Sequence, residues 1–202
     1  MRNGFALPSP LGCTRVEIMR EFRTGLDLHE SGGNMEKIRV LFLAADPRGS
    51  QLQLDKEARE ITTKIRESKF RDSLEFVTRW AVRPDDLQQN LLEVKPQVLH
   101  FSGHGSADEE IVLVDNDGNP KPVSKEALQH LLEVLKDNLQ VVVLNACYSR
   151  PQAKAITQCI DCAIGMTEAI GDEAAILFAG SFYRALGFGR SVQEAFELGI
   201  SS

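Results

Sequence analysis

Short, almost entirely apolar runs alternate with segments of helical period along most of this chain. Ile38 to Ala45 (IRVLFLAA) and Val141 to Leu144 (VVVL) are continuous aliphatic runs, which is typical of strands that are buried on both faces. Between such runs, apolar residues recur at spacings of three and four, as in Leu54, Ala58, Ile61 and Ile65. Strands that alternate with helices predict an α/β fold of three layers, in which a mostly parallel central sheet is flanked by helices on both sides.

The same patterns predict the individual elements. We expect strands over 38–45, 74–82, 98–102, 111–114, 141–144 and 162–166, with 111–114 antiparallel or peripheral. We expect helices over 54–68, 84–92, 152–158, 173–186 and 192–198, and a further helix that begins after an N-cap at Ser124. Asn116 to Pro120 is a turn by composition.

The first 34 residues differ from the rest because they mix glycine, proline and scattered charges without a sustained period. Within them, only Val16 to Phe22 predicts a short helix, and Ser31 to Asn34 (SGGN) predicts a linker. We therefore expect an N-terminal extension over 1–34, either a flexible tail or a docking arm, followed by one domain over 35–202.

Composition excludes several classes of protein. Lys and Arg number 23 against 29 Asp and Glu, so the net charge of -6 argues against direct binding of nucleic acid. No apolar run approaches the ~18 residues that indicate a membrane span, and no secretory signal is present, so we expect a cytoplasmic protein. The four cysteines are too sparse for a disulfide framework. Cys159 and Cys162 have the spacing of half a zinc site but lack a second pair, so we expect no metal and no cofactor.

Two residues with reactive side chains lie where buried strands end. The strand that starts at Val98 runs into Gly103-His104-Gly105, and the strand that starts at Val141 runs into Asn145-Ala146-Cys147. Functional sites of open parallel sheets form at the carboxyl ends of the strands. If the two strands are neighbours, His104 and Cys147 lie at the same edge of the sheet.

A His and Cys pair is what cysteine proteolysis requires. A free thiol, with a pKa of about 8.5, is mostly protonated at neutral pH and needs a nearby imidazole to activate it. We expect Cys147 to be the nucleophile and His104 the acid and base. The backbone N–H groups of Gly105 and Cys147 are candidates to stabilise the oxyanion.

Three segments carry a resemblance to a known family: HFSGHG at 100–105, LNACYS at 144–149, and GMTEAIGDEAAILFAGSFYRALGFGRSVQEAF at 165–196. In this order they resemble a bacterial CHAT domain, of the caspase-type clan, over roughly Arg39 to Phe196. The resemblance implies a caspase-like fold and a cysteine endopeptidase with a His104 and Cys147 dyad. It also implies a protein substrate, a role in regulated proteolysis or anti-phage defence, and control by a sensor or partner protein. Related domains often continue beyond the last helix, so a C-terminally shortened domain fits the resemblance.

The resemblance also points to residues of the first specificity pocket, although their chemistry conflicts. In caspase-like enzymes this pocket is lined by the residue two before the cysteine, here the neutral Asn145, and by the loop after the first strand, here with Asp46 and Arg48. Arg48 would favour an acidic substrate side chain. The acidic loop 106–110 would instead recruit a basic peptide, so the preference stays open.

Other readings of the chain compete with the peptidase. One is a catalytically silent module that keeps the fold and acts by docking. Another is a flavodoxin-like domain, which the single glycine in the loop after the first strand disfavours.

Several residues near the site are expected to be structural. We expect His100 to be a hydrogen-bonded core histidine, Phe182 and Tyr183 to be core residues, Ser102 and Ser149 to have supporting roles at most, and the acids at Asp172 and Glu173 to act as an N-cap.

Overall fold

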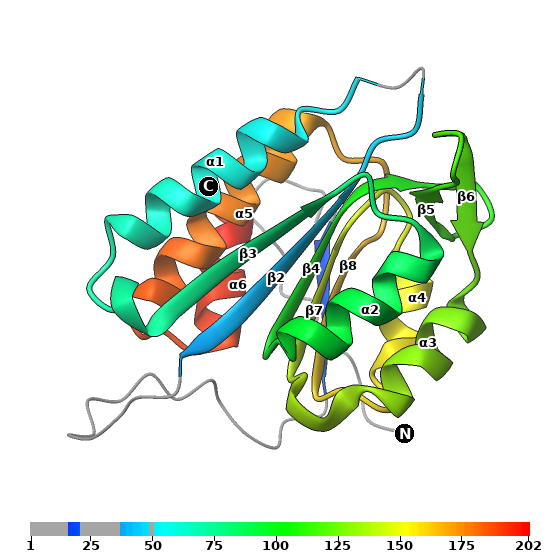
Figure 1. The fold of residues 1–202 in the computed structure, drawn as a ribbon. Helices are drawn as coiled ribbons and strands as arrows, with labels where there is room; N and C mark the ends of the chain where they lie inside the picture. Colours follow the sequence, from blue (N-terminus) through cyan, green and yellow to red (C-terminus); the bar gives the residue numbers. More distant parts are fainter. Residues whose placement is uncertain (1–15, 21–36, 49–50) are drawn as a thin grey trace, which may run out of the picture.

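The computed structural model describes residues 16–20, 37–48 and 51–202, and their central feature is a mostly parallel sheet (Figure 1). Its strands follow the order β1-β8-β7-β4-β2-β3. These are β1 (Val16–Arg20), β8 (Cys162–Met166), β7 (Val141–Asn145), β4 (Val98–Gly105), β2 (Ile38–Ala45) and β3 (Leu74–Trp80). All neighbouring pairs are parallel except β1 with β8. The expected central position of the Val141 strand is confirmed, because β7 lies beside β4 in the middle of the sheet.

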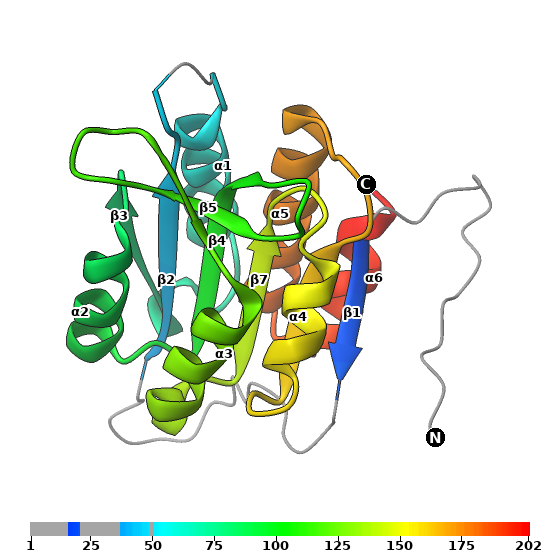
Figure 2. The ribbon, with the colours of Figure 1, turned by 90° about the vertical axis from the view of Figure 1, so that its right-hand side faces the viewer.

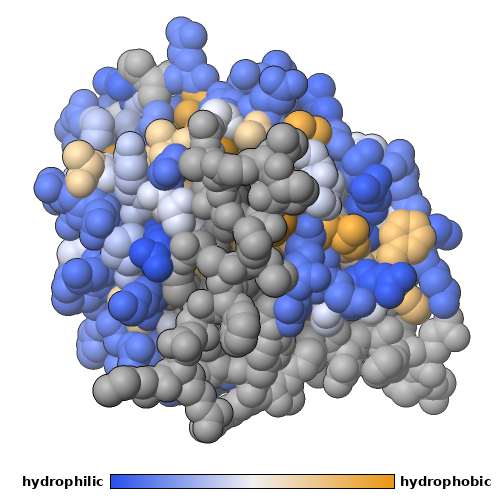
Figure 3. Space-filling view, turned by 180° about the vertical axis from the view of Figure 1, so that it is seen from behind, coloured by the Kyte–Doolittle hydropathy of each residue, from blue (hydrophilic) through white to orange (hydrophobic). Residues whose placement is uncertain are grey.

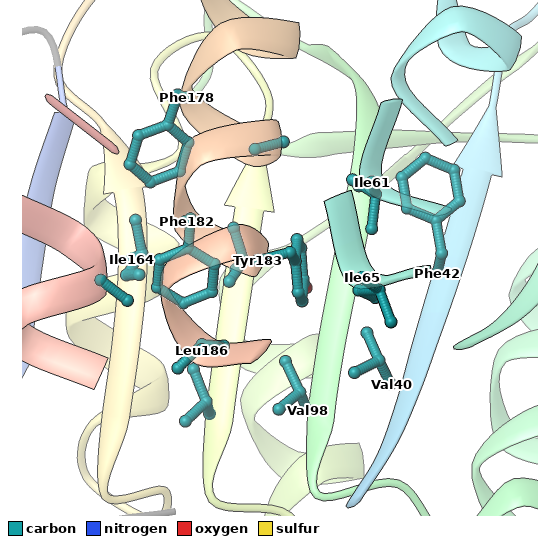
Figure 4. Close-up of a cluster of buried hydrophobic side chains, with 14 of the residues drawn as sticks. Val40, Phe42, Ile61, Ile65, Val98, Ile164, Phe178, Phe182, Tyr183 and Leu186 are labelled. Atoms are coloured by element: carbon teal, nitrogen blue, oxygen red, sulfur yellow. The ribbon is translucent and has the colours of Figure 1, made fainter. Parts of the chain in front are cut away.

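Helices cover both faces of this sheet. Figures 1 and 2 show α1 (Leu54–Arg66), α5 (Asp172–Gly187) and α6 (Val192–Ile200) on one side, and α2 (Pro84–Val94), α3 (Lys125–Val134) and α4 (Arg150–Ile156) on the other. Each side has its own core. Figure 4 shows one of them, where Val40, Phe42 and Val98 of the sheet face Phe182 and Tyr183 of α5. The predicted three-layer α/β fold is confirmed.

Successive side chains of β4 point to opposite faces of the sheet, which decides which of them lie under α1 and α5. His100 lies opposite Phe42 of β2 in the register and Ser102 lies opposite Asn145 of β7, and these residues face the layer of α1 and α5. Leu99 and Phe101 belong to the core on the opposite face. Polar side chains of β4 and β7 are therefore gathered under α1 and α5.

The structure corrects the expectation of a helix over Val16 to Phe22. Val16–Arg20 is strand β1, which pairs with β8. A five-residue segment carries too little periodicity to decide between helix and strand, and the free edge of β8 supplies the backbone partners. The strand lies inside the segment expected to be an extension. The rest of that segment, including the linker Ser31 to Asn34, lies outside the described residues.

Most other elements appear where they were expected, with shifted ends. Strand β4 continues through His104 to Gly105, and Ser124 caps α3 by accepting a hydrogen bond from the backbone N–H of Ala127. The composition of 116–120 suggested a turn only, and β6 (Pro120–Val123) was missed. It pairs with β5 (Ile111–Val114), which is antiparallel to β4 as predicted. Two short 3₁₀ helices, η1 (Arg71–Ser73) and η2 (Lys136–Asn138), were also not foreseen.

On the face seen in Figure 3, the coloured surface is largely hydrophilic and its apolar side chains occur in small groups. In the part of the chain that the structure describes, no helix is both long and apolar enough to cross a membrane.

Candidate active site

The two predicted catalytic residues lie at the same edge of the sheet. Strands β4 and β7 are parallel neighbours, His104 is the second-last residue of β4, and Cys147 follows β7 by two residues. Both side chains line one pocket, together with residues at the start of α1 and at the start of α5. The structure therefore brings together what the sequence places 43 residues apart.

The glycines on both sides of His104 allow the backbone of β4 to lie close to the backbone of Cys147 and of Ala45. A Cβ atom on Gly105 would lie 1.7 Å from the carbonyl oxygen of Cys147 and 3.2 Å from its backbone nitrogen. A Cβ atom on Gly103 would lie 2.6 Å from the carbonyl oxygen of Ala45. The missing side chains thus let β4 approach the backbone that carries Cys147, which places the N–H groups of Gly105 and Cys147 in one neighbourhood.

The turn after Cys147 is held by Ser149. Tyr148 has a φ of 55°, a left-handed conformation that a residue with a Cβ atom rarely adopts. The hydroxyl of Ser149 donates to the carbonyl of Leu144 (2.8 Å) and accepts from the N–H of Met166 (3.0 Å). These bonds tie the end of β7 to β8 and stabilise the tight turn that presents Cys147.

His104 lies beside a carboxylate. Its Nε2 is buried, has no hydrogen-bond partner, and lies 3.7 Å from Oδ1 of Asp46. Asp46 directly follows Ala45, which lies opposite Gly103 in the register of β2 and β4, so the sheet itself sets this proximity. Nε2 is thus the ring nitrogen that faces Asp46.

A buried carboxylate from α1 lies beneath the pocket. The side chain of Glu57 is only 3% exposed. It accepts hydrogen bonds from Nε2 of His100 (3.0 Å), from Nδ2 of Asn145 (2.7 Å) and from the hydroxyl of Ser102. These three donors come from β4 and β7, so Glu57 ties α1 to the two strands that carry the predicted dyad.

Tyr183 completes this network from α5. Its hydroxyl lies 3.1 Å from Nδ1 of His100, and burial, with a further contribution from Glu57, raises its pKa well above 10.0. The phenol therefore stays protonated, and Tyr183 and Glu57 are the hydrogen-bond partners of the two ring nitrogens of His100. The expectation that His100 is a hydrogen-bonded core residue is confirmed, and so is the core position of Tyr183.

Glu57 was missed from sequence, although a signal was present. It stands three residues after Leu54 and next to Ala58, on the apolar face of α1, where a carboxylate needs buried donors. The N-cap expectation for the acids at 172–173 is wrong. Gly171 occupies the cap position, and Oδ2 of Asp172 accepts instead from the backbone N–H of Gln53 (3.1 Å).

Of the three residues expected in the substrate pocket, only one lines the pocket that contains Cys147. Asn145 lines the pocket that contains Cys147. Asp46 and Arg48 are not among the described residues that line it. The backbone N–H of Arg48 donates to the carbonyl of Gly118 (2.8 Å), and its side chain packs against that glycine.

The cysteines in the described part of the chain belong to no metal-binding cluster. Cys147 and Cys159 are free thiols, and the described residues contain no group of three or more His, Cys, Asp or Glu side chains that could hold a metal ion. Burial and the nearby Glu133 raise the pKa of the Cys159 thiol. Cys159 is therefore mostly protonated at neutral pH.

Together, the strand order, the helices on both faces of the sheet and the pocket at its carboxyl edge define a three-layer α/β domain with a candidate site at one edge of the sheet. The model of the CHAT domain matches residues 15–197, and the chain belongs to this family. The matched range includes β1 and ends within α6.

The chain is also similar in sequence to three known proteins. The chain is 29% identical over 157 residues to a "Probable protease" of Gillisia limnaea, and the alignment covers 76% of this chain and 28% of that protein. It is 28% identical over 156 residues to a "Roc-COR-CHAT protease" of an unknown prokaryotic organism, with 73% and 15% covered. It is also 28% identical over 153 residues to a "Roc-COR-CHAT protease" of Runella zeae, with 74% and 16% covered. The chain thus spans less than a third of the length of each relative.

The structure is also similar to the Drosophila initiator caspase Dronc. The TM-score is 0.46 at 8% sequence identity, and the match covers 82% of this chain and 72% of that chain.

Proposed function

We propose that this chain is a cysteine endopeptidase that cleaves a protein substrate with Cys147 as nucleophile and His104 as general acid and base. The observation that carries the proposal is the shared pocket at the ends of β4 and β7, which both side chains line. The protease names of the CHAT relatives support the reaction class.

The reaction begins when His104 takes the proton of the Cys147 thiol. The sulfur attacks the carbonyl carbon of the peptide, and the N–H groups of Gly105 and Cys147 donate to the oxyanion. The C–N bond breaks as the imidazolium donates its proton to the leaving amine. Water then attacks the thioester and gives a proton to His104, and the C–S bond breaks to release the acid.

Asp46 and the Glu57 network support these steps in different ways. Asp46, at 3.7 Å from Nε2, stabilises the imidazolium. Glu57 does not touch the reacting atoms. It fixes β4 and β7 against α1, which keeps the two strand ends in register.

We further propose that the peptidase works in the cytoplasm of a prokaryote as a regulated effector of signalling or anti-phage defence. A catalytic thiol must remain reduced, which suits that compartment. The relatives are several times longer than this chain, and two are named for Roc and COR parts besides CHAT. Their names support control of the CHAT domain by a further module or partner.

Thiol alkylation tests the dyad directly. The chain is treated with iodoacetamide at neutral pH, and peptide mapping follows each cysteine by mass. We expect Cys147 to react about tenfold faster than Cys159, and His104→Ala to remove that advantage. Cys159, whose pKa is raised, is the internal control. Equal alkylation rates at Cys147 and Cys159, unchanged by His104→Ala, would overturn the proposal of a peptidase. That result would favour a catalytically silent module that acts by docking.

A further inference from the structure

The pocket beside Cys147 has a wall that the reaction does not use. Aliphatic side chains at the start of α1 and α5, Leu52, Leu54 and Ile176, line it together with two carboxylates, Glu57 and Asp172. No Lys or Arg occurs among the described residues that form this lining. Apart from His104, the charge of the pocket is therefore entirely negative.

The two carboxylates lie at different depths. Glu57 is almost fully buried beneath the pocket. Asp172 is partly exposed, and its bond from the N–H of Gln53 joins the start of α5 to the segment before α1. Asp172 is therefore the more accessible of the two carboxylates to a cationic group in the pocket.

Asn145 adds an unsatisfied acceptor to the lining of the same pocket. It is 4% exposed, its Nδ2 donates to Glu57, and its Oδ1 has no hydrogen-bond partner. Glu57 only accepts, so the amide nitrogen must face it and the oxygen is left over. A buried acceptor without a donor is costly, and a ligand that supplies an N–H group relieves the cost.

We propose that this pocket is the first specificity pocket of the peptidase and that it takes a lysine or arginine side chain of the substrate. The aliphatic wall packs against the methylene stem, while Asn145 Oδ1 and the carboxylates of Asp172 and Glu57 receive the positive head group. An aspartate is repelled by the same two carboxylates. This inference rests on the proposed function, because the pocket acquires its role only if Cys147 is the nucleophile.

Arg48 does not reverse this preference. It packs against Gly118 and is absent from the described lining, so the acidic substrate that its sequence position suggested has no cationic partner in this pocket.

Three peptidyl acyloxymethyl ketones that differ only in the first side chain, lysine, norleucine or aspartate, test the preference. The rate of covalent labelling of Cys147 is measured by mass on the intact chain. We expect lysine to react at least tenfold faster than norleucine, which has a neutral stem of similar length, and aspartate to react most slowly. A faster reaction with norleucine or aspartate overturns the inference and leaves the dyad standing.

Asp172→Asn tests the pocket residue, with Glu173→Gln as the matched control. Glu173 is the next residue of α5 and is exposed outside the pocket. We expect Asp172→Asn to lower the lysine to norleucine ratio about threefold or more, and Glu173→Gln to leave it unchanged. Equal ratios in both variants contradict the assignment. If no ketone labels Cys147 faster in the wild type than in His104→Ala, the proposed function fails and this inference fails with it.

Discussion

Nε2 of His104 lies 3.7 Å from Oδ1 of Asp46, and the two residues stand at the ends of the adjacent parallel strands β4 and β2. The contact is partly exposed, since the side chains retain 38% and 33% of their accessible surface. It therefore adds little to stability, but it lies where the proposed mechanism forms an imidazolium. Its value is expected in the reaction rather than in the fold.

The variant Asp46→Asn should slow alkylation of Cys147 roughly threefold to tenfold, because the amide keeps the shape and loses the charge beside His104. Its melting temperature should stay within about one degree of the wild type. Asp117→Asn, on the exposed turn between β5 and β6, is the control for loss of one negative charge. A matching rate in both variants would remove Asp46 from the mechanism.

Replacing Glu57 by Gln should lower the free energy of unfolding by about 2–3 kcal/mol. An amide has one acceptor oxygen, whereas three buried donors converge on the carboxylate, so at least one donor loses its partner. Urea unfolding measures the loss. Glu67→Gln, at the exposed end of α1, should cost less than about 0.5 kcal/mol. Equal effects of the two substitutions would mean that the Glu57 network is not what holds α1 to the sheet.

Tyr183 makes stability depend on pH in the alkaline range. Burial raises its pKa in the folded state well above 10.0, so the unfolded chain releases this proton at a lower pH than the folded chain. The stabilisation is complete below pH 10 and is lost as the pH rises above it. Urea unfolding between pH 8 and pH 11 should show the decline, and Tyr183→Phe should flatten it.

The same Tyr183→Phe variant should be less stable than the wild type at pH 8 by about 1–2 kcal/mol, because Nδ1 of His100 loses its hydrogen-bond partner. An alkaline decline of equal slope in both proteins would assign the titration to another group.

Gly105→Ala should abolish rapid labelling of Cys147 and destabilise the fold by about 1–3 kcal/mol. Its new Cβ would overlap the carbonyl oxygen of Cys147, and backbone on both sides must shift. Gly171→Ala is the matched control, because a Cβ there meets nothing within 4 Å and its φ of -76° suits any residue. Normal labelling in Gly105→Ala would show that the close contact is not needed at the site.

Sequence patterns were informative where the signal is local. Nearly continuous aliphatic runs correspond to β2 and to most of β7, because a strand that is buried on both faces has few polar positions. The positions of His104 and Cys147 near the ends of two strands were also predicted from sequence, since each residue stands close to where a buried strand ends. Strand β1 and strand β6 were missed, because a strand of four or five residues at a sheet margin depends on its partner rather than on its own periodicity.

The surroundings of the predicted dyad could not be read along the chain. Glu57 belongs to a helix 45 residues before Ser102 and 88 before Asn145, yet it accepts hydrogen bonds from both. Asp172 was expected to cap its own helix and instead bonds to Gln53, 119 residues away. The hydrogen-bond donors of a carboxylate are those that lie near it in the folded structure, and separation along the sequence does not reveal which residues those are.

By itself the sequence determined the layered α/β fold and the two strand ends that carry His104 and Cys147, because hydrophobic period and strand termination are properties of short windows. Only the tertiary structure decided that β4 and β7 are neighbours, that Asp46 stands beside His104, and that Glu57, Asn145 and Asp172 surround one pocket. Those relations come from packing two layers of helices on a sheet of definite strand order, and packing joins residues that no local pattern connects.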